Sequence, residues 1–390
     1  MSAPLDLLGS LRLRPGVAPP EGILGGRADV SAALLRGQTP GAAIERVALL
    51  HTLCATAHRQ VAQRAVMLAM SSQDAAPDAA PDAATIDRLA ADIAREHARR
   101  IGHDWALAWG GVSQAGALSR LPRKADAHVL ADWLASEWLG LPPSTWLQDM
   151  VGPDRTIDVG RDLPRLIAAL QRSAQACPAG IAAPLVLAVQ RCLALPFTPG
   201  PISAPLRLED PAQARALGHA MTTPGYCRAP TWVDTVTDNA PTTVPDTGPW
   251  NRLERPPATT APTVAVRLLS RWVELLRLAL PLDAGGWRPA HGAVSLGEGH
   301  ALTWVETSRG LLAHRVSLQG HGPDTRVSDW QVLAPTEWNF HPHGTLAHAL
   351  AAWPADHPDT PEAVRLLACA YDPCMACEIE MTTVERTPHA

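Results

Sequence analysis

Hydrophobic residues recur at steps of three and four positions over much of the chain, which is the spacing of residues on one face of an α-helix. In the first such stretch these positions are Ile44, Val47, Leu50, Cys54, Val61 and Ala65. The same spacing predicts helices over 40–70, 86–120, 125–140, 160–195, 263–280 and 360–371. We therefore expect helix to dominate the fold.

Strand signals are strongest in the C-terminal half. The segment ALTWVETSRGLLAHRVSLQG, residues 301–320, has a glycine at its centre and predicts two strands joined by a turn. We expect a small β-rich element over residues 290–340, and hence a mainly α protein with a smaller β part, of the α+β class. The whole chain, 1–390, is expected to form one large domain.

Two segments interrupt the helical pattern. Residues 71–85, SSQDAAPDAAPDAAT, repeat Asp-Ala-Ala-Pro, and their proline and small residues predict a flexible surface insertion. Residues 196–262 are rich in proline and threonine, which predicts an irregular segment with short strands at most.

Composition narrows the class of protein. The chain has 390 residues, 46% of them hydrophobic, which is enough for a substantial core. The net charge is −5 and no basic patch stands out, which argues against nucleic acid as a partner. The longest apolar runs fall short of the ~20 residues of a membrane span, and the N-terminus lacks an export signal. We expect a cytoplasmic protein with no membrane partner.

The cysteines are candidates for chemistry. The chain has seven of them, and an odd number without an export signal indicates free thiols, metal ligands or redox groups. In LLHTLCATAHRQ, the residues His51, Cys54 and His58 are spaced to share one helix face. This is a ligand-like array, although a buried cysteine between two surface histidines is the more ordinary interpretation of the motif taken alone.

A second thiol motif, DPCMAC, lies near the C-terminus. Asp372 and Pro373 predict a helix start, with Asp372 as the N-cap. Cys374 and Cys377 would then fall in the first turn, where the helix dipole favours thiolates. A zinc site completed by upstream ligands, a thiol–disulfide pair and a site for iron or nickel all remain open, because the spacing alone does not choose between them.

Five segments together resemble the [NiFe]-hydrogenase large-subunit superfamily. The chain contains, in the order of that family, LRGQTPGAAIERVALLHTLC, DTGPWNRL, ETSRGLLAHRV, APTEWNFHP and DPCMAC, of which DTGPWNRL is the weakest match. They cover both ends of the chain and most of its C-terminal half. The resemblance implies the helical-bundle fold of a hydrogenase large subunit.

The resemblance also implies roles for individual residues. Cys54 and Cys377 match the two cysteines that bridge nickel and iron in that family, and Cys374 matches a cysteine that binds nickel alone. Arg309 matches the arginine beside an iron-bound cyanide, and His58 falls on the histidine of the family motif.

Two positions depart from the family pattern. His51 stands where the first nickel cysteine is expected, and Glu380 replaces the histidine after which a maturation protease cuts. The iron half of the site is thus kept and the nickel half is damaged, a pattern that resembles HupK/HoxV-type accessory proteins of hydrogenase maturation.

The accessory-protein resemblance implies a scaffold that is not an enzyme. It would hold an Fe(CN)2CO group through Cys54, Cys374, Cys377 and His51, with Arg309 and His58 as supporting residues and nickel unlikely. The expected partners are a maturation chaperone, the factors that build Fe(CN)2CO and the hydrogenase large-subunit precursor. Two alternatives remain open: a divergent catalytic large subunit with His51 on nickel, and a structural zinc-binding interaction protein.

Overall fold

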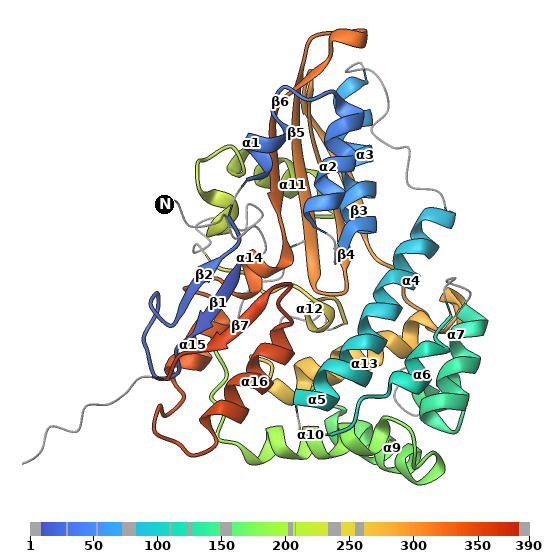
Figure 1. Ribbon diagram of the computed structural model, residues 1–390. Coiled ribbons are helices and arrows are strands. Elements are labelled where there is room, and N and C mark those ends of the chain that lie inside the picture. The colour runs from blue at the N-terminus through green and yellow to red at the C-terminus, as the bar shows by residue number, and fades with distance from the viewer. Residues whose placement is uncertain are drawn as a thin grey trace, which may run out of the picture.

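The computed structural model describes residues 9–28, 30–51, 54–71, 83–108, 111–122, 127–148, 158–201, 206, 208–232, 243–253 and 261–381. The predicted insertion at 71–85 lies mostly outside these ranges. Figure 1 shows a β-sheet with its covering helices in the upper half, a mass of helices in the lower half, and a small second sheet between them at one side.

The larger sheet has four antiparallel strands in the order β3-β4-β5-β6. Their bounds are His291–Gly297, His300–Thr307, Gly310–Gln319 and Arg326–Leu333. Strands β4 and β5 pair directly, Thr307 opposite Gly310, so the hairpin predicted within 301–320 is confirmed. Gly310 has a φ of 130°, a backbone conformation that favours glycine and lets the hairpin turn sharply after Arg309.

Helices cover both faces of this sheet. Helices α2, Pro40–Leu50, and α3, Ala55–Met70, lie on one face, where Ala65 packs in a cluster with Val316 and Trp330. Helix α11, Pro211–Ala220, lies on the other, where Leu217 packs with Trp304. Because successive strand residues point to opposite faces, burial on both sides explains the nearly continuous apolar sequence of β4 and β5.

The helical half is built around α13, Val264–Leu278, in which every residue except Arg277 is buried. Its Trp272 stacks near Trp138 at 6.2 Å between ring centroids and meets Trp146 edge-on at 6.0 Å. The neighbouring long helices are α4 Ala83–Arg99, α7 Ala127–Leu134, α9 Leu163–Ala176, α10 Ala182–Ala194 and α16 Thr360–Tyr371. The helices predicted over 263–280 and 360–371 are therefore confirmed.

Shorter elements complete the chain. The short helices are α1 Ser31–Leu35, α5 Ala106–Ala108, α6 Ala115–Ser119, α8 Pro143–Gln148, α12 Pro249–Leu253, α14 Pro335–Asn339 and α15 Thr345–Ala351. Two π-helical turns, Arg100–Trp105 and Ala135–Leu139, continue α4 and α7. The elements together confirm a mainly α protein of the α+β class.

The second sheet joins the two ends of the chain. Strands β1, Ser10–Leu13, and β2, Ile23–Gly26, are antiparallel, and β7, Ala376–Ile379, runs parallel to β1 at the edge. Beyond β7, Glu380 pairs with Arg14 at 3.3 Å. The segment that carries the second thiol motif is thereby fastened to the N-terminal strands.

The structure corrects several predictions about local structure. The helix predicted over 86–120 is interrupted, because residues 111–114, between α5 and α6, are not helical. The helix predicted over 40–70 is two helices, since α2 ends at Leu50 and α3 begins at Ala55. The three- and four-residue spacing runs on across this break, so periodicity could not reveal it. The segment 196–262 was expected to hold short strands at most, but it contains α11, which Asp210 begins by accepting a hydrogen bond from the Ala212 amide at 2.9 Å.

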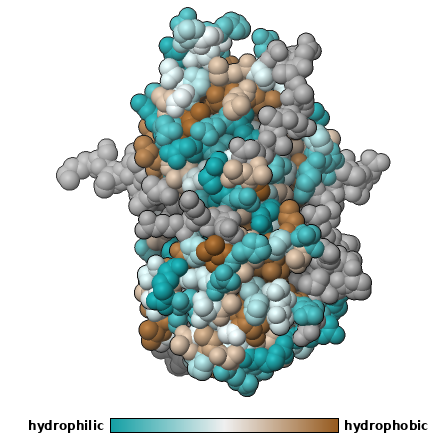
Figure 2. All heavy atoms as spheres, turned by 90° about the vertical axis from the view of Figure 1, so that its right-hand side faces the viewer, coloured by the Kyte–Doolittle hydropathy of each residue, from teal (hydrophilic) through white to brown (hydrophobic). Residues whose placement is uncertain are grey.

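The surface mixes polar and apolar residues. On the face shown in Figure 2, hydrophobic residues lie among hydrophilic ones, with the largest hydrophobic area in the upper half. Among the described residues, no helix has both the length and the apolar composition needed to cross a membrane.

A buried ion-pair group connects the sheet to the helical half. Arg252 of α12, which lies between the two halves in Figure 1, donates to Glu274 of α13 at 2.6 Å and to Glu306 of β4 at 2.5 Å. Burial raises the pKa of Glu274, but Arg252 outweighs it and lowers that pKa to about 2. Glu306 is thereby paired with a cation.

We expect Arg252→Ala to lower the free energy of unfolding by roughly 3–5 kcal/mol, because it leaves the charge of Glu274 buried without its partner. Urea unfolding followed by circular dichroism measures this. The matched control is Arg120→Ala, which breaks an equally bidentate pair with Glu137 at the exposed surface and should cost far less. Equal losses in the two variants would contradict the prediction.

Candidate metal centre

A pocket of about 700 Å³ lies where the two sheets and the helical half meet. Cys54, at the start of α3, and Cys374, just after α16, both line it. Arg309 enters from the β4–β5 turn and Thr336 from the start of α14. Two thiols from opposite ends of the chain therefore share one cavity beside a guanidinium group.

Cys54 is held by Arg309. One guanidinium nitrogen of Arg309 donates to the Sγ of Cys54 at 3.5 Å. Burial raises the pKa of the Cys54 thiol and Arg309 acts against that rise without cancelling it. Cys54 is therefore a thiol at neutral pH, and a metal that binds its sulfur must displace the proton.

Cys374 is held by two donors. The Thr336 hydroxyl donates to its Sγ at 3.1 Å, and Arg27, from the segment after β2, donates at 3.5 Å. Its own amide donates back to the Thr336 oxygen at 3.4 Å. Cys374 is thus fixed against the pocket wall from two sides.

Cys377 does not join the two pocket cysteines. Strand alternation turns Ala376 and Glu378 of β7 toward the pocket, whereas Cys377 and Ile379 pack against the helical core. Burial raises the pKa of the Cys377 thiol to about 12. The prediction placed both cysteines of the motif in one helical turn, and a strand in this position separates them instead.

Asp372 is not the helix N-cap that the sequence suggested. It ends α16 in the left-handed conformation, φ 53°, and its buried carboxylate pairs with Arg100 at 2.8 Å and Arg271 at 3.0 Å. Arg309 lies at 3.7 Å from the same carboxylate. Burial acts to raise the pKa of Asp372, but these three arginines hold it well below its ordinary value.

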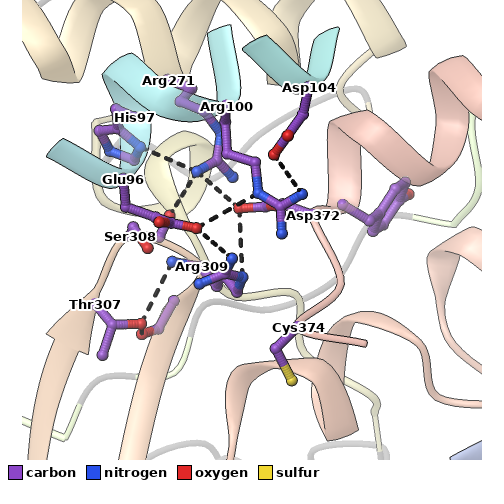
Figure 3. Close-up of polar contacts among 12 residues, drawn as sticks. Glu96, His97, Arg100, Asp104, Arg271, Thr307, Ser308, Arg309, Asp372 and Cys374 are labelled. Atoms are coloured by element: carbon purple, nitrogen blue, oxygen red, sulfur yellow. Dashed lines mark hydrogen bonds and ion pairs between the residues drawn. The ribbon is translucent and has the colours of Figure 1, made fainter. Parts of the chain in front are cut away.

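Figure 3 shows the ion-pair group of Asp372, Arg100, Arg271 and Arg309, with Cys374 lying beside it. Glu96 of α4 also pairs with Arg309, and Arg309 lowers the Glu96 pKa to about 2 against the effect of burial. Arg100 begins the π-helical turn after α4, a feature often found at functional sites. Sequence reasoning missed Glu96, Arg100, Arg271 and Arg27; only the dense charge of REHARR, residues 95–100, signalled part of this group.

The two histidines of the first thiol motif are stacked, not side by side on one helix. His51 caps the end of α2, and its ring lies parallel to that of His58, with 3.9 Å between centroids. His58 Nδ1 is 2.9 Å from His314 Nε2. Burial lowers the pKa of His51 to about 3 and those of His58 and His314 well below their ordinary value, so all three rings are neutral at pH 7.

Within the described ranges, no group of three or more histidine, cysteine, aspartate or glutamate residues is arranged to hold a metal ion. The pocket lining supplies two thiols, two neutral imidazoles, four guanidinium groups and the carboxyl groups of Asp104 and Glu378. Such a site suits a metal that arrives with ligands of its own better than a bare ion, which needs about four protein ligands if it is zinc.

Known proteins resemble the chain in sequence and in fold. The model of the nickel-dependent hydrogenase family matches residues 263–380. The chain is 31% identical to the hydrogenase expression/formation protein HoxV of Cupriavidus necator, with 100% of both proteins covered. It is 36% identical to the hydrogenase expression/formation protein HupK of Bradyrhizobium diazoefficiens, over 35% of this chain and 39% of that protein. A solved [NiFeSe]-hydrogenase of Dm. baculatum covers 90% of this chain and 92% of its own, with 15% identity and a TM-score of 0.48.

The neutral buried histidines predict a fall in stability on acidification. Burial lowers the pKa of His51 to about 3 and that of His97 to about 4. Below about pH 6.5 the unfolded chain therefore binds protons that the folded chain does not. Each such histidine then lowers the free energy of unfolding by about 1.4 kcal/mol per pH unit.

We expect the free energy of unfolding to have its highest value above about pH 6.5 and to fall steadily toward pH 5.5. Urea titrations at several pH values measure this. His97→Gln removes one of the titrating rings and should reduce the slope of stability against pH, whatever its effect on absolute stability. A stability that stays flat over this range would show that the rings are not neutral in the folded protein.

Proposed function

The chain belongs to the family of hydrogenase expression/formation proteins that includes HoxV, and from this membership we propose that it is a non-catalytic scaffold that receives, holds and passes on an Fe(CN)2CO group, its cargo. The single observation that carries the proposal is the meeting of Cys54 and Cys374 in one pocket beside Arg309. Those residues come from three distant parts of the sequence.

The chemistry of the cargo suits this pocket. An iron atom that carries two cyanides and a carbonyl already has three of its ligands, so two thiolates are enough to anchor it and few enough to release it. Arg309, 2% exposed, presents guanidinium donors that can hydrogen-bond a cyanide nitrogen, which carries partial negative charge. Thr336 and Arg27 brace the Cys374 sulfur, so the second anchor is preorganised.

Two features favour iron cargo over the alternatives. A structural zinc ion would need about four protein ligands, and no group of three or more histidine, cysteine, aspartate or glutamate residues in the described ranges is arranged to hold a metal ion. A catalytic nickel site would need the first cysteine of the family motif, where this chain has His51. We therefore propose that the protein binds iron without nickel and does not turn over hydrogen.

A scaffold of this kind needs a donor and an acceptor. We propose that a maturation chaperone with the factors that build Fe(CN)2CO supplies the cargo, and that the hydrogenase large-subunit precursor receives it. We propose that the exchange takes place in the cytoplasm.

Infrared spectroscopy tests the proposal. Protein purified without oxygen after co-expression with a complete maturation system should show cyanide and carbonyl stretching bands and contain iron without nickel. Cys54→Ala and Cys374→Ala should each abolish the bands and the iron, because each removes one of two anchors. Bands and iron missing from the unaltered protein would refute the proposal.

Two further cysteine variants serve as controls. Cys177→Ala removes a thiol that donates to the Glu137 carbonyl oxygen and does not line the pocket. This variant should keep the bands at full strength. Cys377→Ala is the sharper comparison, because it alters the same Cys-x-x-Cys motif on the face of β7 that turns away from the pocket. We expect it to retain the cargo; loss of the bands would mean that β7 shifts its register by one residue when iron binds.

A further inference from the structure

We propose that His51 does not bind iron but presents an Nε2–H donor to the acceptor atoms of the cargo, and that Arg27 is the positioning residue that keeps it in this form. The inference rests on the proposed function for the identity of the cargo. Its basis is the set of hydrogen bonds to the Nδ1 atoms of His51 and His58, the two stacked imidazoles. These bonds decide which nitrogen of each ring carries the proton.

Arg27 determines the state of His51. A guanidinium nitrogen of Arg27 lies 2.6 Å from His51 Nδ1. Because a guanidinium group has donors only, Nδ1 must be the acceptor, and the proton of the neutral ring is on Nε2. A metal needs the lone pair of an unprotonated ring nitrogen, so this arrangement leaves His51 with none to offer on either nitrogen.

The Nε2–H of His51 lacks a partner. His51 is 7% exposed and lines the pocket, and its Nε2 is buried without a hydrogen bond to any residue that the structure describes. Buried donors are nearly always satisfied, so an orphan of this kind at a pocket wall indicates a ligand that accepts the bond. The terminal nitrogen of a metal-bound cyanide is an acceptor of the required kind.

His58 is fixed in the same way by a separate chain of bonds. The Trp330 indole, which can only donate, is 3.4 Å from His314 Nδ1, so His314 carries its proton on Nε2. That Nε2 lies 2.9 Å from His58 Nδ1, which must accept, and this leaves the His58 proton on Nε2. Both stacked rings thus carry an N–H group on Nε2, whereas a nickel or zinc ion would require a lone pair there. The two rings therefore favour a cargo that accepts hydrogen bonds.

Arg27 also connects this donor to an anchor. Its second terminal nitrogen donates to the Cys374 sulfur at 3.5 Å, so one guanidinium spans the ring of His51 and the thiol. Lysine has a single ammonium head and cannot keep the fork geometry that reaches both groups. Arg27 therefore sets the distance between a cargo anchor and a cargo hydrogen-bond donor.

The first experiment needs no cargo. Nitrogen-15 NMR of the full-length, iron-free protein labelled at histidine should show His51, assigned by comparison with His51→Gln, as the neutral Nε2–H form. Arg27→Ala should change that signal, whereas Arg36→Ala, which removes an exposed arginine bonded to the Ser328 carbonyl, should not. A His51 ring protonated on Nδ1 in the unaltered protein would overturn the inference.

The second experiment uses the loaded protein. His51→Ala should shift at least one cyanide band while keeping most of the iron that Cys54→Ala loses, and His51→Gln should restore the band position, because the glutamine amide supplies an N–H near Nε2. Arg27→Ala should shift the same band and should also lower the iron content in part, because it removes one of the two donors that hold the Cys374 sulfur. Loss of iron in both His51 variants, as in Cys54→Ala, would show that His51 is a ligand and overturn the inference.

The two experiments separate this inference from the proposed function. If the unaltered protein carries no cyanide bands while the NMR signals behave as expected, the cargo is wrong and the fixed Nε2–H form of His51 stands. If the bands are present but neither His51 variant moves them, the scaffold function stands and the donor role of His51 is refuted.

Discussion

The burial of one carboxylate, that of Asp372, is the constraint on which the pocket depends. Its partners come from three parts of the fold: Arg100 from the turn after α4, Arg271 from the central helix α13, and Arg309 from the β4–β5 turn. A buried charge left without partners is costly, so these elements must meet at this point for the chain to fold. Cys374 follows two residues later, and its place is therefore fixed by an electrostatic requirement that has nothing to do with metal.

In the same group of charges, Arg309 makes structural ion pairs on one side and contacts the Cys54 sulfur on the other. The carboxylates of Glu96 and Asp372 pair with one terminal nitrogen and the Nε of Arg309. The other terminal nitrogen donates to the Cys54 sulfur. Under the proposed function this division would help a scaffold pass its cargo on, because the ion pairs of Arg309 with Glu96 and Asp372 form without iron. Under the proposed function, two sulfur anchors and a set of hydrogen-bond donors would bind an iron that carries diatomic ligands specifically and still reversibly.

Much of the fold and part of the site could be read from the sequence. The hairpin within 301–320 and the helices over 263–280 and 360–371 follow from local patterns, because a long run of apolar residues at one period leaves little choice of structure. The break at His51 did not show, since the helical spacing continues through it. The family resemblance identified Cys54, Cys374 and Arg309 as candidates because their surrounding motifs are local strings of residues.

The fold class, the main elements and the candidate thiols follow from patterns among residues that are neighbours along the chain. Three facts could not be read from such patterns: Asp372 is an ion-pair centre and not a cap, Cys377 faces the core, and Arg27 donates to Nδ1 of His51. These facts depend on which distant segments pack together and on the face that each strand turns to its neighbours. Spacing along a chain specifies a residue's local face, but the partners on that face are set by packing and by the need to neutralise buried charge.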